Sequence, residues 1–224
     1  MNIEDKKILI GVPCGSGYMP TLMVQSLLQL HKTKNCAFIT VDRQRIDKAR
    51  NFFVKQAIEG DFDYLLMIDD DNPVPPETLF KLLEDDKDVV VTPILSRNPN
   101  AEGKHTLCAF YKEDRLVKEK TIPYYNPIEN FREEGTLHEV DSVGCGCILI
   151  KREVLLAVAK EYEYPFEFGD ITVEGQRRVM SEDCEFSERV AKLGFKLWLN
   201  ESIVPVHLGA QKIIKYDMVR TNIK

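Results

Sequence analysis

The sequence lacks the long apolar run that a membrane-spanning helix needs. Apolar stretches such as residues 65–68 and 147–150 are far shorter than the roughly eighteen residues that such a helix requires. Residues 1–7 mix acidic and basic side chains, so no basic region followed by an apolar stretch marks a secretion signal. We therefore expect a cytoplasmic protein that does not span a bilayer.

The sequence also lacks a second cysteine pair at zinc-site spacing and a dense stripe of basic residues. The six cysteines are scattered, and the Cys145-Gly-Cys147 pair has no second pair at the spacing of a zinc site. The formal net charge is −6 and the 30 Lys and Arg residues are dispersed, which argues against an extended nucleic acid as a partner. An acidic protein that binds a small diphosphate would need a local cation beside its own carboxylates.

The first hundred residues contain a regular alternation of strand and helix patterns. Nearly continuous apolar runs predict strands, and apolar residues at three-to-four-residue spacing between these runs predict helices. The strands are expected at residues 7–12, 36–41, 63–69 and 88–95, and the helices at 20–31, 46–59 and 76–86. The pattern predicts a parallel sheet with helices on both faces.

The second half of the sequence is less regular. Turn-forming residues are frequent up to about residue 130, with a hairpin expected around residues 111–116. Helices are expected at 152–162 and 182–193, strands at 139–150 and 195–200, a polar loop at 169–180, and a last amphipathic helix after residue 209.

Three consecutive carboxylates, Asp69, Asp70 and Asp71, stand at the end of the third predicted strand. Ligands of open α/β sheets bind at this carboxyl edge. Side chains alternate along an extended chain, which would place Asp69 and Asp71 on one face and Asp70 on the other. A divalent cation would relieve the repulsion among the three charges. The alternative is a polar turn that caps the next helix.

These carboxylates lie in a segment that resembles a known family. Residues 65–79 resemble the hydrophobic strand, Asp-x-Asp motif and downstream proline of GT-A fold nucleotide-sugar glycosyltransferases, particularly family 2. Four further segments resemble family motifs in the expected order. They are the first strand and loop at 8–15, the Ala-Arg-Asn helix start at 46–57, the glycine turn at 142–155 and the Glu-Asp motif at 181–195.

The resemblance implies a single GT-A domain over residues 1–224, an α/β fold with a Rossmann-like, mostly parallel central sheet flanked by helices. Residues 1–100 would bind the nucleotide sugar, and residues 101–224, with a small antiparallel element, would bind the acceptor and carry out catalysis. The implied activity is metal-dependent transfer of a sugar from a UDP- or GDP-sugar to an acceptor hydroxyl. The implied residues are Pro13, Arg50, Asn51, Asp69, Asp70, Gly144 and Gly146 for the donor, Asp69, Asp71 and His207 for Mn²⁺ or Mg²⁺, and Glu182 and Asp183 for catalysis.

Within the Glu-Asp motif, the resemblance makes Asp183 the general base of an inverting transfer. A helical projection places Asp183 beside the apolar face and Glu182 toward the surface, so Asp183 should be the better sheltered acid. Both acids would also favour the dipole of a helix capped by Ser181, whatever their chemistry. Arg50 is either a phosphate ligand at a helix start or an exposed helix arginine. The loop at residues 169–180 is a candidate lid.

Other functions remain open from the sequence. A retaining transferase of the mannosylglycerate-synthase type would share the fold and metal site, and a catalytically silent module would keep only sugar-nucleotide binding. A nucleotidyltransferase usually carries Arg and Lys in its first loop, and residues 13–20 contain neither. An aspartyl phosphotransferase of the haloacid dehalogenase type has its Asp-x-Asp after the first strand of its core, not after a third. The donor, the acceptor, the stereochemical outcome and the oligomeric state are not determined by these patterns.

Overall fold

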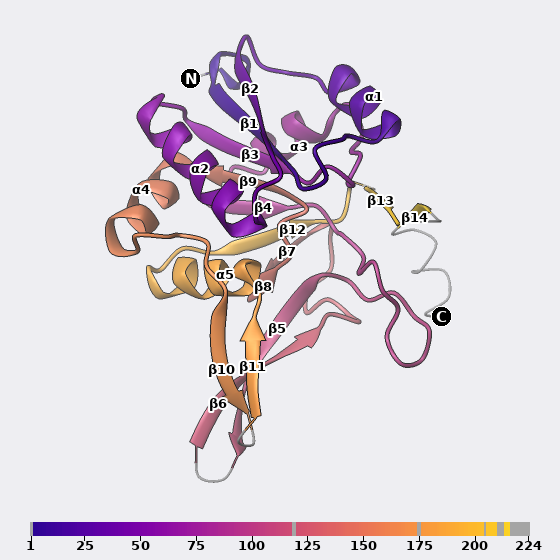
Figure 1. Cartoon of the computed structure of the whole chain (residues 1–224), viewed down its shortest axis with the longest axis vertical. Coiled ribbons are helices and arrows are strands. Elements are labelled where there is room, and N and C mark those ends of the chain that lie inside the picture. The colour runs from indigo at the N-terminus through magenta and orange to yellow at the C-terminus, as the bar shows by residue number, and fades with distance from the viewer. Residues whose placement is uncertain (1, 118–119, 174–175, 204, 210–212, 216–224) are drawn as a thin grey trace.

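A seven-stranded sheet forms the centre of the computed structural model (Figure 1). The structure describes residues 2–117, 120–173, 176–203, 205–209 and 213–215. Within these residues the helices are α1 (Thr21–Gln29), α2 (Ile46–Glu59), α3 (Thr78–Glu84), α4 (Arg152–Glu161) and α5 (Glu182–Lys192), with a short 3-10 helix, η1, at Ile3–Asp5.

The strands divide between the central sheet and smaller antiparallel sheets. The central sheet contains β1 (Lys7–Cys14), β2 (Asn35–Asp42), β3 (Tyr64–Ile68), β4 (Val89–Val91), β7 (Leu137–Val140), β9 (Cys147–Lys151) and β12 (Leu197–Asn200). The smaller sheets pair β5 (Ala109–Val117) with β6 (Lys120–Pro127) and β8 (Ser142–Val143), β10 (Gly169–Val173) with β11 (Gln176–Met180), and β13 (Val206–Leu208) with β14 (Ile213–Lys215).

The central sheet has the strand order β2-β1-β3-β9-β4-β12-β7. The pairs β1 with β2, β1 with β3, and β4 with β12 are parallel, whereas β9 and β7 run antiparallel to their neighbours. Five of the seven strands therefore share one direction, and the predicted mostly parallel sheet is confirmed. β9 comes from the second half of the chain and lies between β3 and β4, so both halves of the sequence build this one sheet.

Helices cover both faces of the central sheet, as predicted. On one face, α2, α4 and α5 contribute the buried side chains of Phe53, Val154 and Phe186. On the other face, α1 and α3 contribute Met23 and Leu79. The side chains of β3 alternate between these two clusters, which explains its uninterrupted apolar sequence. Full burial of each such apolar side chain stabilises the fold by about 1.5–3 kcal/mol.

The hairpins β5–β6 and β10–β11 project from the same end of the molecule (Figure 1). The hairpin expected around residues 111–116 is confirmed and is longer than predicted. The polar loop expected at residues 169–180 is wrong, because Gly169 to Val173 pair with Met180 to Gln176 as an antiparallel ladder. These two strands pair only with each other, outside the central sheet, and so lack the continuous apolar run that predicted the buried strands.

The end of the chain also differs from expectation. A helix was expected after residue 209, but Ile213–Lys215 is a strand, β14, paired antiparallel with β13. Residues 210–212 and 216–224 lie outside the described residues. In the part of the chain that the structure describes, no helix is both long and apolar enough to cross a membrane.

Candidate active site

The three consecutive carboxylates form a turn at the carboxyl end of β3. The strand ends at Ile68, and the Asn72 amide donates a hydrogen bond to the Asp69 carbonyl at 3.0 Å. The Asp69 amide donates to the Gly146 carbonyl at 2.8 Å, which fixes the turn against the chain just before β9. Because the chain is not extended here, the alternation expected to pair Asp69 with Asp71 does not apply. The three carboxylates contact different partners.

Arg50 joins this acidic turn to the Glu-Asp motif. Its side chain extends from α2 and is 1% exposed, so the alternative of an exposed helix arginine is wrong. Its guanidinium lies 3.2 Å from Asp69 Oδ1. It also lies 3.5 Å from Glu182 Oε1 and 3.5 Å from Asp183 Oδ1, at the start of α5. Arg50 and Glu182 are 132 positions apart in the sequence, yet they share one buried charge cluster.

The surroundings hold the Arg50 guanidinium in place. Its Nη1 donates to the Cys145 carbonyl at 3.3 Å, and its Cζ lies 5.9 Å from the centroid of the Phe166 ring. That ring stacks on Phe186 with centroids 4.1 Å apart. Burial alone would lower the pKa of Arg50, but the charges of the neighbouring carboxylates, Asp69 first among them, raise it. Arg50 is therefore a permanent cation.

One cation cannot neutralise three carboxylates, and the pKa values reflect this. Burial raises the pKa of Asp69, with Arg50 opposing the rise and Asp183 adding to it. Burial and the charge of Asp183 raise the pKa of Glu182 to about 7, although Arg50 opposes this shift too. Raised pKa values mean that these buried carboxylates keep their protons to higher pH, and a further cation nearby would oppose that rise.

The relative burial of the two acids of α5 is the reverse of the prediction. Glu182 is 5% exposed, whereas the Asp183 side chain is 21% exposed. The expectation that Asp183 would be the better sheltered acid was wrong, because the helical projection did not include Arg50, which contacts Glu182 from α2. Ser181 caps α5 as predicted, since its hydroxyl accepts a hydrogen bond from the Cys184 amide.

Asp71 lies beside a histidine and an arginine. The Leu208 amide of β13 donates to the Asp71 carbonyl at 2.8 Å, which brings His207 against the acidic turn. His207 Nε2 lies 3.3 Å from Asp71 Oδ2, and Arg97 Nη2 pairs with the same oxygen. The Asn72 side-chain amide donates to Asp71 Oδ1 at 2.7 Å. The predicted pair of Asp71 and His207 is therefore adjacent.

The protonation of His207 suits a cation ligand. Its Nδ1 lies 2.6 Å from the Leu95 carbonyl, which can only accept, so Nδ1 carries a proton, and Nε2 faces Asp71 at 3.3 Å. Burial lowers the pKa of His207. In its neutral form the imidazole would present the Nε2 lone pair beside the carboxylate, and imidazole with carboxylate is a donor set that Mn²⁺ accepts.

A complete protein-only metal cage is not formed. Among the described residues, no group of three or more His, Cys, Asp or Glu side chains is arranged to hold a metal ion. Asp69 is turned toward Arg50, and its Oδ1 receives no hydrogen bond of normal geometry despite the 3.2 Å ion contact. Asp71 and His207 thus remain two adjacent candidate ligands, a number that would suit an ion whose other ligands are substrate phosphates and water.

Asp70 faces a different loop. Burial raises its pKa, and the Cys14 thiol and the Gly15 amide oppose the rise, so the carboxylate lies against the loop that follows β1. Arg43 approaches the same loop, since its amide donates to the Cys14 carbonyl at 3.0 Å. A Cβ atom added at Gly17 would lie 2.8 Å from Arg43 Nε. The first loop lacks basic residues in its sequence but has an arginine beside it in space.

Two predicted donor residues are engaged by the protein itself. Asn51 binds the Phe166 backbone through both polar atoms, with its amide donating to the carbonyl at 2.6 Å and its Oδ1 accepting from the amide at 2.9 Å. Asn51 therefore anchors the segment between α4 and β10. Pro13 is buried near the end of β1, paired with Val41 of β2.

The two glycines of the predicted donor set allow close packing of the chain. A Cβ atom at Gly144 would lie 2.9 Å from Cys108 Cβ. A Cβ atom at Gly146 would lie 3.0 Å from Ile94 and 3.2 Å from Asn72 Nδ2. A larger residue at Gly146 would push against Asn72 of the acidic turn, and one at Gly144 would push against Cys108.

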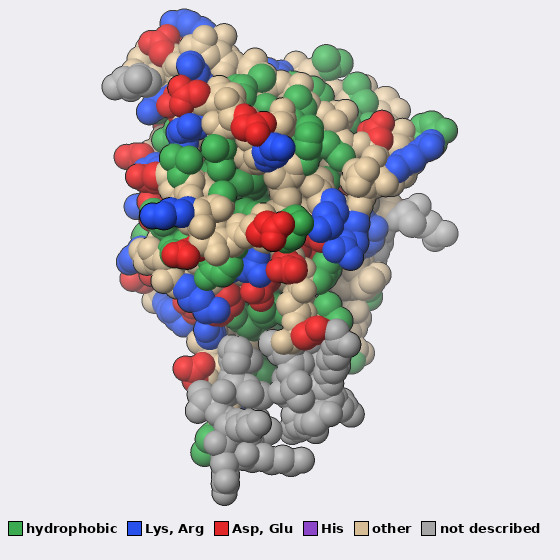
Figure 2. Space-filling view, turned by 60° about the vertical axis from the view of Figure 1, so that its left-hand side comes forward, with side chains coloured by type: hydrophobic (Ala, Val, Ile, Leu, Met, Phe, Trp, Pro, Cys, Tyr) green, Lys and Arg blue, Asp and Glu red, His purple; other side chains and the backbone are tan. Residues whose placement is uncertain are grey.

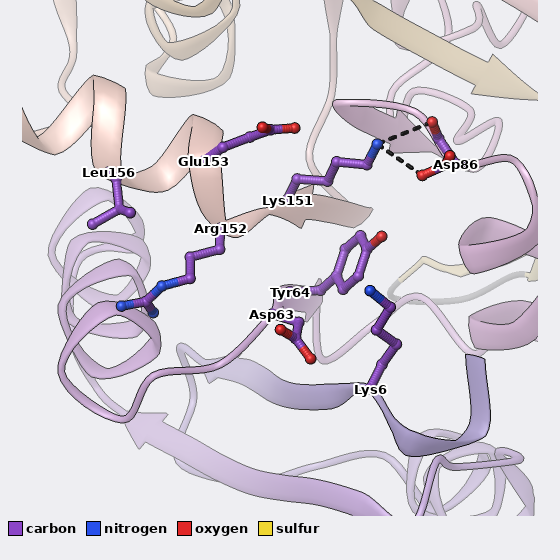
Figure 3. Close-up of a pocket in the computed structure, with 8 residues that line it drawn as sticks. All are labelled: Lys6, Asp63, Tyr64, Asp86, Lys151, Arg152, Glu153 and Leu156. Carbon is purple, nitrogen blue, oxygen red and sulfur yellow. Dashed lines mark hydrogen bonds and ion pairs between the residues drawn. The ribbon is translucent and has the colours of Figure 1, made fainter. Parts of the chain in front are cut away.

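A surface hollow of about 400 Å³ lies away from this cluster. It is at the opposite edge of the central sheet, where Tyr64 begins β3 and Lys151 ends β9 (Figure 3). Figure 3 shows Lys151 paired with Asp86, and Lys6 Nζ lies 5.7 Å from the centroid of the Tyr64 ring. Lys151 pairs with Asp86 and Arg152 with Asp61 at this hollow, which lies apart from the acidic cluster.

The surface in Figure 2 carries acidic and basic side chains intermixed, without a continuous stripe of either sign on that face.

Arg97 and Arg43 are the site residues that the sequence did not indicate. Each lies in a loop without periodicity, and each reaches the site only through the fold, Arg97 at Asp71 and Arg43 at Gly17. A search for isolated basic residues within a few positions of predicted strand ends could have found both.

Comparison with known proteins identifies the fold. No protein-family model and no curated protein sequence matches this chain. Solved structures do match. A197 from STIV aligns with a TM-score of 0.57 and 15% identity over 93% of each chain. The inositol-1-phosphate CTP transferase from T. maritima aligns with a TM-score of 0.51 and 12% identity over 98% of this chain and 97% of that one. The chain therefore has the α/β fold of these proteins, with a mostly parallel, Rossmann-like central sheet.

Proposed function

We propose that this protein is a metal-dependent glycosyltransferase of the GT-A fold that moves a sugar from a UDP- or GDP-sugar to an acceptor hydroxyl. The observation that carries the proposal is the contact of Arg50 with Asp69 on one side and with Glu182 and Asp183 on the other. This contact unites a donor-side motif with a candidate catalytic motif at the carboxyl edge of the sheet, where α/β enzymes bind their ligands. A polar turn that merely caps α3 would not require it.

The donor diphosphate would bind between the acidic turn and His207. Asp71 and His207 would hold the divalent ion, Asp69 would supply a further oxygen to the ion or bind the ribose, and substrate oxygens would complete the ligand set. When bound, such an ion supplies Lewis-acid stabilisation of the negative charge that develops on the leaving diphosphate. Gly144 and Gly146 would let the sugar approach the backbone of the turn before β9.

Asp183 would be the general base. Its side chain is 21% exposed, against 7% for that of Glu182, so it is the acid more open to an acceptor. The Asp183 carboxylate would take the proton of the acceptor hydroxyl as that oxygen bonds to the anomeric carbon. The bond from that carbon to the phosphate oxygen breaks, and the nucleoside diphosphate leaves with the electron pair. Inversion at the anomeric carbon is the outcome of this single displacement.

Glu182 would hold the Arg50 guanidinium in position. Its contact with Arg50 Nε at 3.5 Å keeps the guanidinium between the two motifs.

The hairpins β5–β6 and β10–β11 are the proposed acceptor side, since β11 leads directly into α5 and the Tyr125 hydroxyl of β6 donates to Glu188 of α5.

The test is turnover with a panel of donors. The protein is incubated with Mn²⁺ and UDP- or GDP-sugars, and nucleotide release is measured with and without a chelator. We expect release that depends on the metal and on one class of donor. No release from any donor, together with no metal-dependent nucleotide binding, would reject the proposal.

A nucleotidyltransferase is the second candidate. It is favoured by the likeness to a CTP transferase and by Arg43, which places a cation beside the first loop where the sequence has none. Incubation with CTP or UTP and a sugar 1-phosphate distinguishes the two, because only a nucleotidyltransferase releases pyrophosphate.

A further inference from the structure

Asp71 is almost enclosed by the protein, and Arg97 covers its open side. The Asp71 side chain is 14% exposed, whereas that of Arg97 is 57% exposed. Asn72 occupies Oδ1, while Arg97 and His207 both face Oδ2. The Arg97 guanidinium is therefore the solvent-facing partner of this carboxylate.

Arg97 satisfies the same electrostatic requirement as a metal ion. His207 Nδ1 lies 2.6 Å from the Leu95 carbonyl, and Nε2 faces Asp71 Oδ2 at 3.3 Å. The Arg97 guanidinium places a permanent positive charge beside the same oxygen. A divalent ion held by Asp71 and His207 would need the same oxygen, and two cations at one oxygen repel each other.

The backbone around Arg97 is fixed, although its side chain is exposed. Leu95 forms a β-bridge with Leu107, and the Ser96 amide donates to the Thr106 carbonyl at 2.7 Å. The Ser96 hydroxyl donates to the Asn98 carbonyl at 2.9 Å. The long side chain can therefore change partner by rotamer motion alone, on the picosecond-to-nanosecond scale of exposed side chains.

We propose that Arg97 is an exchangeable counter-ion of Asp71, which a divalent ion displaces and which then binds the diphosphate of the nucleotide. Arginine suits both roles, because its planar fork of donors binds carboxylate and phosphate equally well. The inference rests on the proposed function. It makes Arg97 a positioning residue for the donor and ties nucleotide binding to metal binding.

The exchange predicts effects of opposite sign on two affinities. In Arg97→Ala, Mn²⁺ alone should bind about fivefold more tightly, as expected for loss of a competing ion pair worth about 1 kcal/mol. At saturating Mn²⁺, UDP or GDP should bind about tenfold more weakly, because a charge-assisted hydrogen bond to phosphate is lost. A variant that is merely misfolded would weaken both.

The experiment measures Mn²⁺ binding by electron paramagnetic resonance and UDP or GDP binding by calorimetry. Wild type, Arg97→Ala and Asp71→Asn are compared. Arg132→Ala is the matched control, because Arg132 is 59% exposed and also pairs with a carboxylate, that of Asp141. Opposite shifts in Arg97→Ala, none in Arg132→Ala and weaker Mn²⁺ binding in Asp71→Asn would support the exchange.

Failure of the Arg97 exchange and failure of the proposed function would give different results. Equal Mn²⁺ affinity in wild type and Arg97→Ala, with a loss in Asp71→Asn, would overturn the exchange and leave the metal site of the proposed function intact. Unchanged nucleotide affinity in Arg97→Ala would overturn the diphosphate contact. If no variant binds Mn²⁺ and nucleotide binding is absent or independent of metal, the exchange and the metal-dependent function fall together.

Discussion

At the scale of single residues, one guanidinium faces three carboxylates in the candidate active site. Arg50 is buried among the core-facing positions of α2. Because it is charged, an apolar pattern does not predict this burial. The sequence placed Arg50, Asp69, Glu182 and Asp183 in one site only through the resemblance. Their contacts come from packing between elements distant in the chain, which local patterns do not contain.

Removing the Arg50 charge tests its structural role. Arg50→Met should destabilise the protein by about 3–5 kcal/mol at pH 7, because it leaves buried carboxylates without their cation. The free energy of unfolding from urea titration measures this. Lys55→Met is the matched control on α2, since Lys55 is 68% exposed and pairs only with Glu59, so its effect should stay within about 0.5 kcal/mol. Similar losses in both variants would contradict the account.

The raised pKa of Glu182 predicts that the stability of the protein depends on pH. Its pKa is raised from 4.5 to about 7 in the folded protein, so its stabilising contribution is complete below pH 4.5 and is lost as the pH rises through 7. Glu182→Gln cannot ionise. Between pH 5 and 8 the free energy of unfolding of wild type should therefore fall by on the order of 1–3 kcal/mol more than that of the variant. The melting temperature, measured across this pH range, should show the same difference in direction. Parallel melting curves would show that Glu182 ionises normally.

At the scale of elements, sequence patterns located the central strands, the helices α1 to α5 and the hairpin β5–β6, and missed β10–β11 and β14. The runs that became β1, β3 and β4 are apolar because both faces of the sheet are covered, and this leaves a signal in the sequence. The sequences of the hairpin β10–β11 and of the short strand β14 contain no such run. Spacing alone also could not show that β9 lies between β3 and β4, because that order is set by tertiary packing.

The contact of α2 with β1 offers an element-scale prediction. A Cβ atom at Gly11 would lie 2.7 Å from the Phe53 ring, so Gly11→Ala must push α2, which carries Arg50, away from the sheet. We expect a loss of about 1–3 kcal/mol in the free energy of unfolding. Gly15→Ala is the control, because its Cβ would meet nothing within 4 Å. A neutral Gly11→Ala would mean that α2 does not pack as closely as described.

At the scale of the whole molecule, the site belongs to neither half of the sequence alone. α2 and the turn after β3 bring Arg50 and Asp69, whereas α5 brings Asp183 and β13 brings His207. The fold class followed from the sequence because alternating strands and helices allow few topologies. Arg97, which pairs with Asp71, and Arg43, which lies beside the first loop, did not, because loops place them by tertiary contact.

In the proposed function, Asp183 of the second half acts on a donor that residues of both halves hold. The most direct test compares Asp183→Asn with wild type in turnover and in nucleotide affinity, using the donor that wild type accepts. The account predicts a fall in kcat of about 10²–10⁴, as for loss of a general base, with UDP or GDP affinity changed less than about threefold. Wild-type turnover in Asp183→Asn, or equal losses of turnover and nucleotide binding, would contradict it.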